Sequence, residues 1–463
     1  MTRTFERILR RASSRRFRAA TVAVLLGACS SETILQAPDP DLVTPETVRS
    51  AEGANAVYIG ALDRFRNITG GAESSWLFGG LLADEWSSSS TFIQNDETDQ
   101  RQIQPSNSSI TGMFRNLARV RTASNQAIAG LNEYQPTRIA EVAEMYFNRG
   151  FAEMQMAQDF CNGIPLSDAT GAVIVFGQPL PVSQVFQVAV ASYDSALALV
   201  AGRTDSMSIR VNRSARIGKA RAQLGLGDAA AAAATLASGT AIPTSFALLH
   251  TFAPSSGDNI LWSQPFSAIR YVVGDSLEGN APNLIPVANA IGFARAGDPR
   301  LPVTISTTAN GQDGQTRHRR TTLWGRSTSI PVVNGLDARL IEAEARLEAL
   351  DRPGTLAILN ALRAAPPTLG TVTPAAMGPL ADPGTQGGMV SMYFREKAFW
   401  TFSRGQRLGD MRRMIRDYGR TVDNTFPTGT HFKGPQYGSD VSLPVPDDER
   451  NNPNFQGCID RNP

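Results

Sequence analysis

Apolar residues recur at spacings of three and four along much of the chain, which is the spacing of one face of an α-helix. One such face comprises Met113, Leu117, Val120, Ser124, Ala127 and Leu131. A second comprises Phe186, Val190, Tyr193, Leu197 and Val200. Further helices are expected at 44–65, which opens with Thr-Pro-Glu, and at 137–160, which a Gly-Ile-Pro sequence ends. The pattern predicts a mostly α protein.

Two pairs of helical segments are separated by short polar turns and predict antiparallel helical hairpins. The pairs are 213–225 with 228–237 and 336–350 with 355–364. In the third of these segments Glu342 and Arg346 are expected to pair at i,i+4 on the solvent side. The residues expected to face inward there are Leu336, Leu340, Ala343, Leu347 and Leu350. Repeated helix pairs predict a tetratricopeptide-like solenoid, although no strict repeat period is present.

Three long stretches without helical periodicity interrupt these hairpins, at 70–110, 239–335 and 365–388. Irregular segments of that length are uncommon inside a compact domain and often carry binding sites. We therefore expect the helical solenoid to be a scaffold and these insertions to carry the function.

The chain opens with an arginine-rich segment followed by a short apolar run, which is typical of an export signal. The run at 19–28 is about half of the ~20 residues that a membrane-spanning helix needs. Leucine, glycine and alanine directly precede Cys29, as in a lipobox, so we expect Cys29 to carry lipid. The alternative is an ordinary signal peptide with a chance cysteine. The serine after Cys29 favours the outer membrane.

These signals divide the chain into three parts. The expected parts are a signal peptide at 1–28, an extended proline-containing tether at 29–44 and one ligand-binding domain at 45–463. No later apolar run approaches membrane length, so the lipid on Cys29 is expected to be the only anchor in the membrane.

Composition excludes one class of partner. The formal net charge of the whole chain is +2 and 42% of its residues are hydrophobic. Much of the positive charge belongs to the signal segment, and no later stretch gathers lysine and arginine with interleaved aromatic residues. Nucleic acid is therefore not an expected partner.

The cysteine count predicts a disulfide. The chain has three cysteines. With Cys29 acylated, Cys161 and Cys458 remain as a pair in an exported, oxidising setting, where an even remainder favours a bridge. Two buried free thiols are the alternative.

The C-terminal third carries several short motifs. They are Ala343-Glu344-Ala345, Arg395-Glu396, Gly405-Gln406-Arg407, Asp410, Arg412-Arg413, Leu443-Pro444-Val445-Pro446 and Asn452-Pro453-Asn454. In this order they resemble the SusD/RagB family of outer-membrane nutrient-binding lipoproteins. The N-terminal half is similar too, in its lipobox and tether, in Asn125, Glu144 and Arg149, and in the Gly-Ile-Pro-Leu sequence that begins at Gly163. The resemblance covers nearly all of the mature chain.

Two positions depart from the family pattern. Trp400 stands where the family usually has a second glutamate, and Ser403-Arg404-Gly405 stands where it has Phe-Glu-Gly. We expect structural ion pairs to be replaced by packing there, and the alternative is an altered surface toward a partner. Arg407 and Asp410, three residues apart, are expected to hold each other as part of the scaffold.

The resemblance implies an outer-membrane position that faces the cell surface, a SusC-like TonB-dependent transporter as partner, and capture of nutrient fragments without covalent chemistry. The alternative from a different class is a lipid-anchored helical-repeat scaffold for envelope assembly.

Catalytic patterns are weak. The three histidines, at 250, 318 and 431, have no metal-ligand spacing, and neither a nucleophile elbow nor a phosphate loop is present. Acidic pairs such as Asp84-Glu85 are expected to be solvated loop residues, with sugar hydrolysis as the remote alternative. Asp258 or Asp313 would be the place for a calcium ion, although no EF-hand pattern is present. We expect neither an enzyme nor a cofactor.

Flat aromatic side chains flanked by amide and guanidinium groups suit oligosaccharides, and this argument slightly favours a carbohydrate ligand over a peptide. The candidate ligand-binding residues are Trp86, Phe92, Asn95 and Arg101 in the first insertion and Tyr271, Trp324 and Arg326 in the second. They would form one platform if the two insertions converge. The alternative for each aromatic residue is core packing.

Overall fold

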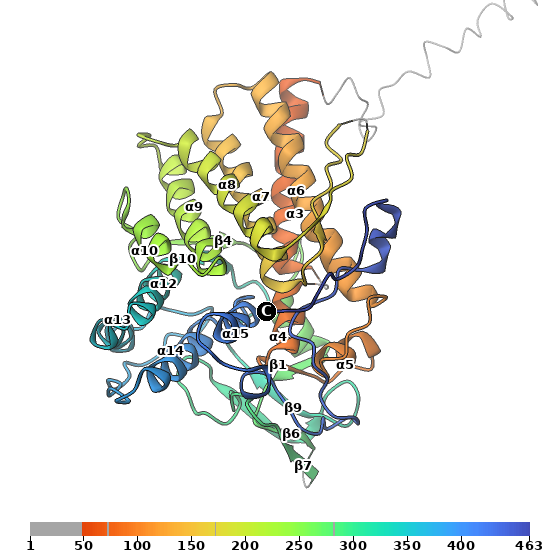
Figure 1. Cartoon of the computed structure of the whole chain (residues 1–463), viewed down its shortest axis with the longest axis vertical. Helices are drawn as coiled ribbons and strands as arrows, with labels where there is room; N and C mark the ends of the chain where they lie inside the picture. The colour runs from red at the N-terminus through yellow and green to blue at the C-terminus, as the bar shows by residue number, and fades with distance from the viewer. Residues whose placement is uncertain (1–48, 72–73, 172, 281–282) are drawn as a thin grey trace, which may run out of the picture.

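The computed structural model describes residues 49–71, 74–171, 173–280 and 283–463. The expected signal peptide, Cys29 and the tether at 29–44 lie outside the described residues. Helices are the main regular elements of the structure and follow one another in an arch, from the red and orange helices at the top of Figure 1 to the blue ones at the lower left. No helix among the described residues is long and apolar enough to cross a membrane.

Successive long helices pack side by side: α3 on α6, α6 on α7, α7 on α8, α8 on α9 and α9 on α10, and the series continues through α12 and α13 to α14. Their bounds are α3 (Ala51–Gly70), α6 (Ser108–Tyr134), α7 (Ile139–Asp159), α8 (Val182–Leu199), α9 (Ser206–Gly225), α10 (Ala229–Ala237), α12 (Gly335–Glu348), α13 (Arg352–Ala364), α14 (Gln386–Trp400) and α15 (Arg407–Arg416). This is the expected mostly α solenoid of helical hairpins.

The apolar face predicted around residue 120 is the buried face of α6, from Met113 to Leu131. The first long helix begins later than predicted. Its N-cap is Ser50, whose hydroxyl accepts a hydrogen bond from the backbone N–H of Gly53 at 3.0 Å. A serine cap satisfies one of the free N–H groups of a first turn, which explains where α3 begins.

Both predicted hairpins are present, α9 with α10 and α12 with α13. Leu350, expected to face inward, is 70% exposed, since α12 has ended and a positive φ of 61° turns the chain outward there. The predicted Glu342–Arg346 pair is also wrong. Glu342 accepts a hydrogen bond from Arg339, three residues earlier, at 2.6 Å, and Arg346 pairs with Asp351 in the turn.

The insertions are less irregular than expected. The first contains α4 (Ser75–Leu82), β1 (Trp86–Ser88) and α5 (Ile93–Asp99). The second contains β4 (Ala247–His250), α11 (Ile260–Trp262), the π-helical turn η1 (Ser263–Ser267), β5 (Tyr271–Val273), β6 (Leu277–Asn280), β7 (Asn283–Pro286), β8 (Val303–Asn310), β9 (Arg317–Thr321) and β10 (Ile330–Asn334). These strands are short, so they carry little of the period-two alternation by which a strand is recognised.

The strands form antiparallel two-stranded sheets: β1 with β5, β4 with β10, β6 with β7, β8 with β9, and β2 (Ile164–Pro165) with β3 (Pro179–Leu180). In β1 and β5, Trp86 lies opposite Val273 and Ser88 opposite Tyr271. The two long insertions therefore converge, as the predicted platform required.

Buried ion pairs join the C-terminal helices to one another. Glu344 on α12 accepts hydrogen bonds from Arg413 Nε at 2.9 Å and Nη2 at 3.0 Å and from Lys397 Nζ at 3.3 Å. Burial opposes ionisation of Glu344, but Arg413 and Lys397 outweigh it and lower the pKa of Glu344 to about 2. Asp410 accepts from the same two cations, at 2.7 and 2.8 Å.

The remaining motif residues also have buried partners. The expected Arg407–Asp410 pair is wrong, because Arg407 instead holds Asp84 of the first insertion through two hydrogen bonds of 2.7 and 2.9 Å. Trp400 is buried, with the guanidinium carbon of Arg300 4.7 Å from its ring centre. Arg404 makes two hydrogen bonds of 2.8 Å to Asp337. These motifs belong to the core.

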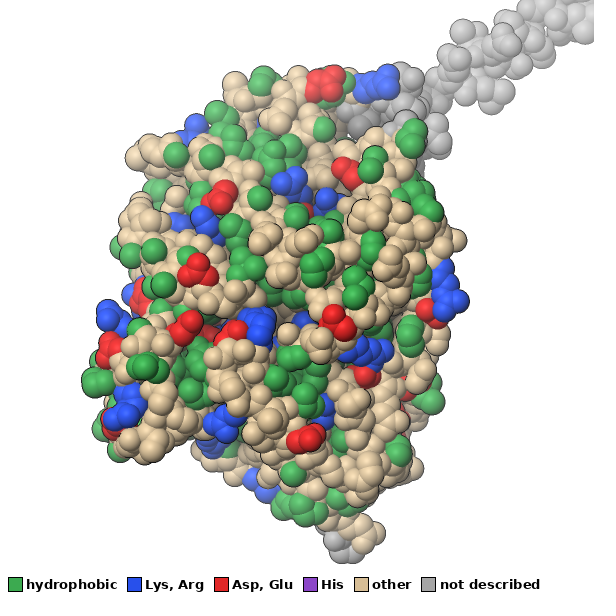
Figure 2. Space-filling view, in the orientation of Figure 1, with side chains coloured by type: hydrophobic (Ala, Val, Ile, Leu, Met, Phe, Trp, Pro, Cys, Tyr) green, Lys and Arg blue, Asp and Glu red, His purple; other side chains and the backbone are tan. Residues whose placement is uncertain are grey.

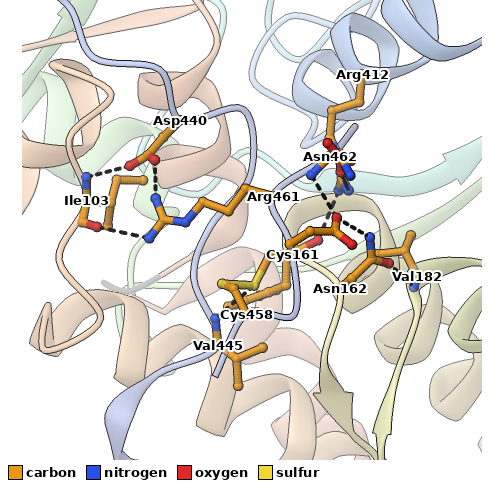
Figure 3. Close-up of a disulfide and its surroundings, with 12 residues drawn as sticks. Ile103, Cys161, Asn162, Val182, Arg412, Asp440, Val445, Cys458, Arg461 and Asn462 are labelled. Atoms are coloured by element: carbon orange, nitrogen blue, oxygen red, sulfur yellow. Dashed lines mark hydrogen bonds and ion pairs between the residues drawn. A yellow bond between two sulfur atoms is a disulfide. The ribbon is translucent and has the colours of Figure 1, made fainter. Parts of the chain in front are cut away.

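The structure contains the Cys161–Cys458 disulfide, which links residues 297 apart in the sequence (Figure 3). Around it the C-terminal tail makes a series of polar contacts. Asn162 donates to Asp460 at 2.7 Å, and Arg461 pairs with Asp440 and donates to the carbonyl of Ile103 at 3.3 Å. The tail is thus fastened across the end of α7.

Candidate functional site

Three predicted platform residues lie in the core instead of at the surface. Trp86 and Tyr271 are 1% and 2% exposed, and Trp86 packs against Phe402 with ring centres 5.0 Å apart. Trp324 is buried and donates from its ring nitrogen to the hydroxyl of Ser403 at 2.7 Å. Large aromatic side chains gain most free energy when they are fully buried, and the converging insertions provide that space. The prediction that these three rings form a sugar platform is therefore wrong, because they pack in the core.

Asn95 and Arg101 are buried as well, so the prediction that they bind ligand is also wrong. Arg101 donates to the carbonyls of Asp440 at 2.9 Å and Pro427 at 2.7 Å, and its guanidinium lies 4.9 Å from the ring centre of Phe426. Burial lowers the pKa of Arg101 to about 10. This arginine fastens the C-terminal segment to the first insertion.

Asp84 and Glu85 are not the solvated acids that the sequence suggested. Asp84 is paired with Arg407, and Glu85 accepts a hydrogen bond from the backbone N–H of Ser403 at 2.9 Å. Burial raises the pKa of Glu85 well above its usual value. Both side chains are buried in the core, where no substrate reaches them.

Phe92 and Arg326 are the two predicted residues that stay at the surface. Phe92 is 45% exposed, and the guanidinium carbon of Arg270 lies 4.4 Å from its ring centre. Arg326 donates to Asp258 at 2.7 Å, and its guanidinium carbon lies 6.0 Å from the ring centre of Trp262. Both belong to a surface that the sequence reasoning only partly found.

This surface, called here the aromatic–arginine face, consists of Phe92, Trp262, Phe266, Arg270, Arg320 and Arg326. The rings of Trp262 and Phe266 are stacked, with centres 5.4 Å apart and planes inclined by 20°. The guanidinium carbon of Arg320 lies 4.1 Å from the centre of Phe266. Gln264 accepts a hydrogen bond from Arg270 at 3.4 Å and so connects the two halves of the face.

The local backbone explains why these side chains reach the surface. The side chain of Asn259 caps α11 by accepting from the N–H of Leu261 at 2.8 Å, and α11 continues into the π-helical turn η1. Ile269 follows with a positive φ of 55°, which is unfavourable for a β-branched residue. π-Helical turns and strained residues are concentrated at functional sites.

A buried cation lies next to the segment that carries Phe92. Lys433 Nζ lies 2.7 Å from Asp96, 2.8 Å from Asp313 and 3.0 Å from the carbonyl of Ser90. Burial opposes ionisation of Asp313, but hydrogen bonds from Lys433 and Thr316 outweigh it and lower the pKa of Asp313. The ammonium group thus joins both insertions to the C-terminal segment. It also occupies the carboxylate of Asp313, which was a candidate calcium ligand in the sequence.

The chemistry of the face suits binding. Ring faces contact the CH groups of a sugar or the apolar parts of a peptide, and the edges of the guanidinium groups donate to hydroxyl or carboxylate oxygens. The described residues contain no group of three or more His, Cys, Asp or Glu side chains that would hold a metal ion. Burial lowers the pKa of His318, the histidine nearest to Arg320, and therefore keeps it neutral at physiological pH.

Sequence reasoning missed Trp262, Phe266, Arg270 and Arg320. One signal was present, since Trp262 and Phe266 are four residues apart, and a helical turn places residues at that spacing on one side.

Charge is dispersed over the visible surface. On the side shown in Figure 2, basic and acidic side chains are interspersed, and no broad basic area is present there. Binding of nucleic acid relies on such an area, so that side offers no footprint for it.

No protein-family model and no curated protein sequence matches the chain. Solved structures do match it. They include a SusD superfamily protein from Bacteroides vulgatus, with 14% identity and a TM-score of 0.59 over 88% of this chain and 98% of that one. A SusD-like carbohydrate-binding protein from the same organism has 13% identity and a TM-score of 0.59, over 88% of this chain and 97% of that one.

A third match is NanU from Bacteroides fragilis, with 15% identity and a TM-score of 0.58 over 91% of this chain and 99% of that one. The TM-scores and the nearly complete coverage establish a shared fold, and sequence identities this low show no more than the fold. The chain therefore has the mostly helical SusD-like fold.

Proposed function

We propose that this protein is a lipid-anchored, nutrient-binding subunit of the outer membrane. It captures oligosaccharide fragments on the aromatic–arginine face, without catalysis, and passes them to a SusC-like TonB-dependent transporter. The cell surface is its proposed location, with Cys29 as the lipidated residue.

The observation that carries this proposal is the aromatic–arginine face on a SusD-like fold. A solved structure with the same fold is a SusD-like carbohydrate-binding protein, which supports a glycan as the ligand. Exposed Phe266, stacked on half-buried Trp262 and flanked by guanidinium groups, suits the CH faces and hydroxyl rims of sugars.

The first experiment is a screen of neutral glycans, uronic-acid-containing glycans and peptides against the protein beginning at Ser30. Every contact described above lies within residues 49–463, so this protein retains all of them. We expect one glycan class to bind. Binding of peptides alone would redirect the ligand assignment, and an absence of binding in all three classes would contradict the proposal.

The site is then tested by Trp262→Ala and Phe266→Ala. Loss of one stacking contact is worth about 0.5–1.5 kcal/mol, so each substitution should weaken glycan binding about threefold to tenfold. Ile59→Ala is the matched control, because Ile59 is an exposed apolar residue on α3, outside the face. Equal affinity of all three variants and the parent would remove the face as the binding site.

Anchoring and partner have separate tests. Cys29→Ser should leave a precursor without lipid that no longer sediments with outer membranes. Retention of the serine variant in that fraction, with no change in mass, would contradict lipidation at this residue. For the partner, a neighbouring reading frame that encodes a plug-and-barrel receptor favours the transport role, whereas one that encodes assembly machinery favours the scaffold alternative.

A further inference from the structure

Four consecutive apolar side chains are exposed on the hairpin formed by β2 and β3. Val173, Ile174, Val175 and Phe176 are 78%, 52%, 66% and 42% exposed. No charged residue occurs from 169 to 178. Runs of this kind are rare on the surface of soluble domains unless they take part in an interaction.

The hairpin holds this apolar run in place. The backbone groups of Asp168 and Val175 exchange two hydrogen bonds of 2.8 Å, and the carboxylate of Asp168 accepts from the N–H of Thr170 at 2.8 Å. At the other end Asn452 donates to the carbonyl of Gly177 at 2.9 Å. The backbone N–H and carbonyl of Val175 are thus paired within the protein, which lowers the polar cost of moving the tip into an apolar environment.

The hairpin lies beside the first described part of the chain. Thr170 and Arg49, the first described residue, line the same hollow of about 760 Å³ beside α3 and α6. In Figure 1 the gold strands of this hairpin rise along the same end of the helical arch. A lipid on Cys29 is about 20 residues away from Arg49, within about 70 Å of extended chain.

We propose that residues 173–176 form a second contact with the membrane, in which the hairpin tip inserts shallowly into the lipid interface beside the anchor. This inference rests on the proposed anchoring at Cys29. A small apolar contact binds a bilayer reversibly, so it can be measured without the anchor in excess lipid, and a lipid on the same molecule raises the effective concentration of the tip at the surface. The second contact would fix the orientation of the protein on the bilayer.

The size and composition of the tip favour lipid over a protein partner. Four partly exposed side chains offer a few hundred Å², well below the ~800 Å² that each partner buries in a standard protein interface. The tip also lacks charged and hydrogen-bonding side chains, which would set the register against a protein. A bilayer requires neither a large area nor a fixed register.

The test uses the protein that begins at Ser30, and therefore lacks the lipid anchor. Cys161 and Cys458 are bonded to each other, so Val173→Cys introduces a single free thiol that takes an environment-sensitive fluorophore. Vesicles of phosphatidylethanolamine and phosphatidylglycerol should raise its emission severalfold and shift it to shorter wavelength. The same fluorophore on Leu350→Cys, in the α12–α13 turn, should not respond. Leu350 is as exposed as the tip residues and belongs to a different hairpin.

A second variant carries serine at all four tip positions. The fraction that sediments with the vesicles should fall roughly tenfold, because most of the apolar area that can enter the bilayer is removed. Glycan binding by this variant should equal that of the parent, so a failure of the membrane contact is distinguishable from a failure of the proposed function. The lipid proposal would be overturned if the emission of the tip fluorophore did not change with vesicles, or changed only with the purified transporter. Equal sedimentation of the serine variant and the parent would also overturn it.

Discussion

In the core between α12 and α15, Arg404, Arg407 and Arg413 are almost completely buried, and each makes two hydrogen bonds to one carboxylate. On the aromatic–arginine face, Arg270 and Arg320 lie on rings and remain partly open to solvent. A guanidinium paired with a buried carboxylate has its donors occupied and serves the fold. A guanidinium stacked on a ring keeps its edge for a ligand.

The largest expected effect concerns a buried carboxylate. Glu344→Gln should destabilise the protein by about 3–5 kcal/mol, because it leaves Arg413 and Lys397 buried with only Asp410 to compensate them. Denaturant unfolding measures the change. Glu342→Gln is the matched control on the same helix, since it removes a partly exposed ion pair worth at most about 1 kcal/mol. Equal losses of unfolding free energy in the two variants would contradict the expected difference between buried and surface carboxylates.

A pair of tryptophans tests the same distinction with aromatic residues. Trp86→Ala should cost about 3–5 kcal/mol of stability because it leaves a cavity between β1, Tyr271 and Phe402. Trp262→Ala, on the face, should cost far less stability and act on ligand binding. A thermal unfolding curve and a binding curve for each variant settle the assignment. A Trp86→Ala variant that is as stable as the parent but binds ligand more weakly would support the predicted sugar platform around Trp86 instead of the aromatic–arginine face.

The disulfide should have a smaller effect. Replacing Cys161 and Cys458 together by alanine should lower the unfolding free energy by about 2–4 kcal/mol, since a bridge mainly restricts the unfolded chain. Binding to the face should be unchanged. Mass spectrometry of a non-reduced digest provides the control on the parent, and recovery of both peptides with free thiols would contradict the bridge.

The last expected effect depends on pH and comes from Asp159 at the end of α7. Unlike Glu344, it accepts hydrogen bonds from the amides of Gln155 and Gln158, and burial raises the pKa of Asp159 to about 7. The folded state therefore holds a proton that the unfolded state releases near pH 4. Stability relative to Asp159→Asn should fall as pH rises from about 4 to about 7, by at most about 1.4 kcal/mol per pH unit, and then level off. A flat difference curve would contradict the raised pKa.

The helical scaffold could be predicted from the sequence because its faces repeat over many turns. The buried residues of α6, from Met113 to Leu131, follow directly from that periodicity. The binding face could not be predicted in the same way. In strands of three residues such as β1 and β5, nothing local tells which aromatic side chains turn inward, and Trp86 and Tyr271 turn inward because partners distant in the sequence surround them.

Ion pairs were mispredicted for a related reason. Arg407 and Asp410 are near neighbours on one helix, yet Arg407 pairs with Asp84, 323 residues away. Sequence spacing identifies contacts within an element, whereas pairs between elements depend on how the insertions fold back over the helices.

That same pair constrains how the protein matures. Asp84 meets Arg407 across 323 residues and Arg101 meets the carbonyl of Asp440 across 339, so the first insertion cannot complete its contacts until the last tenth of the chain has been made. Folding with such high contact order is slow compared with helix formation. The part of the core around the first insertion therefore closes only after most of the chain has been made. Such late closure would suit the proposed export before folding.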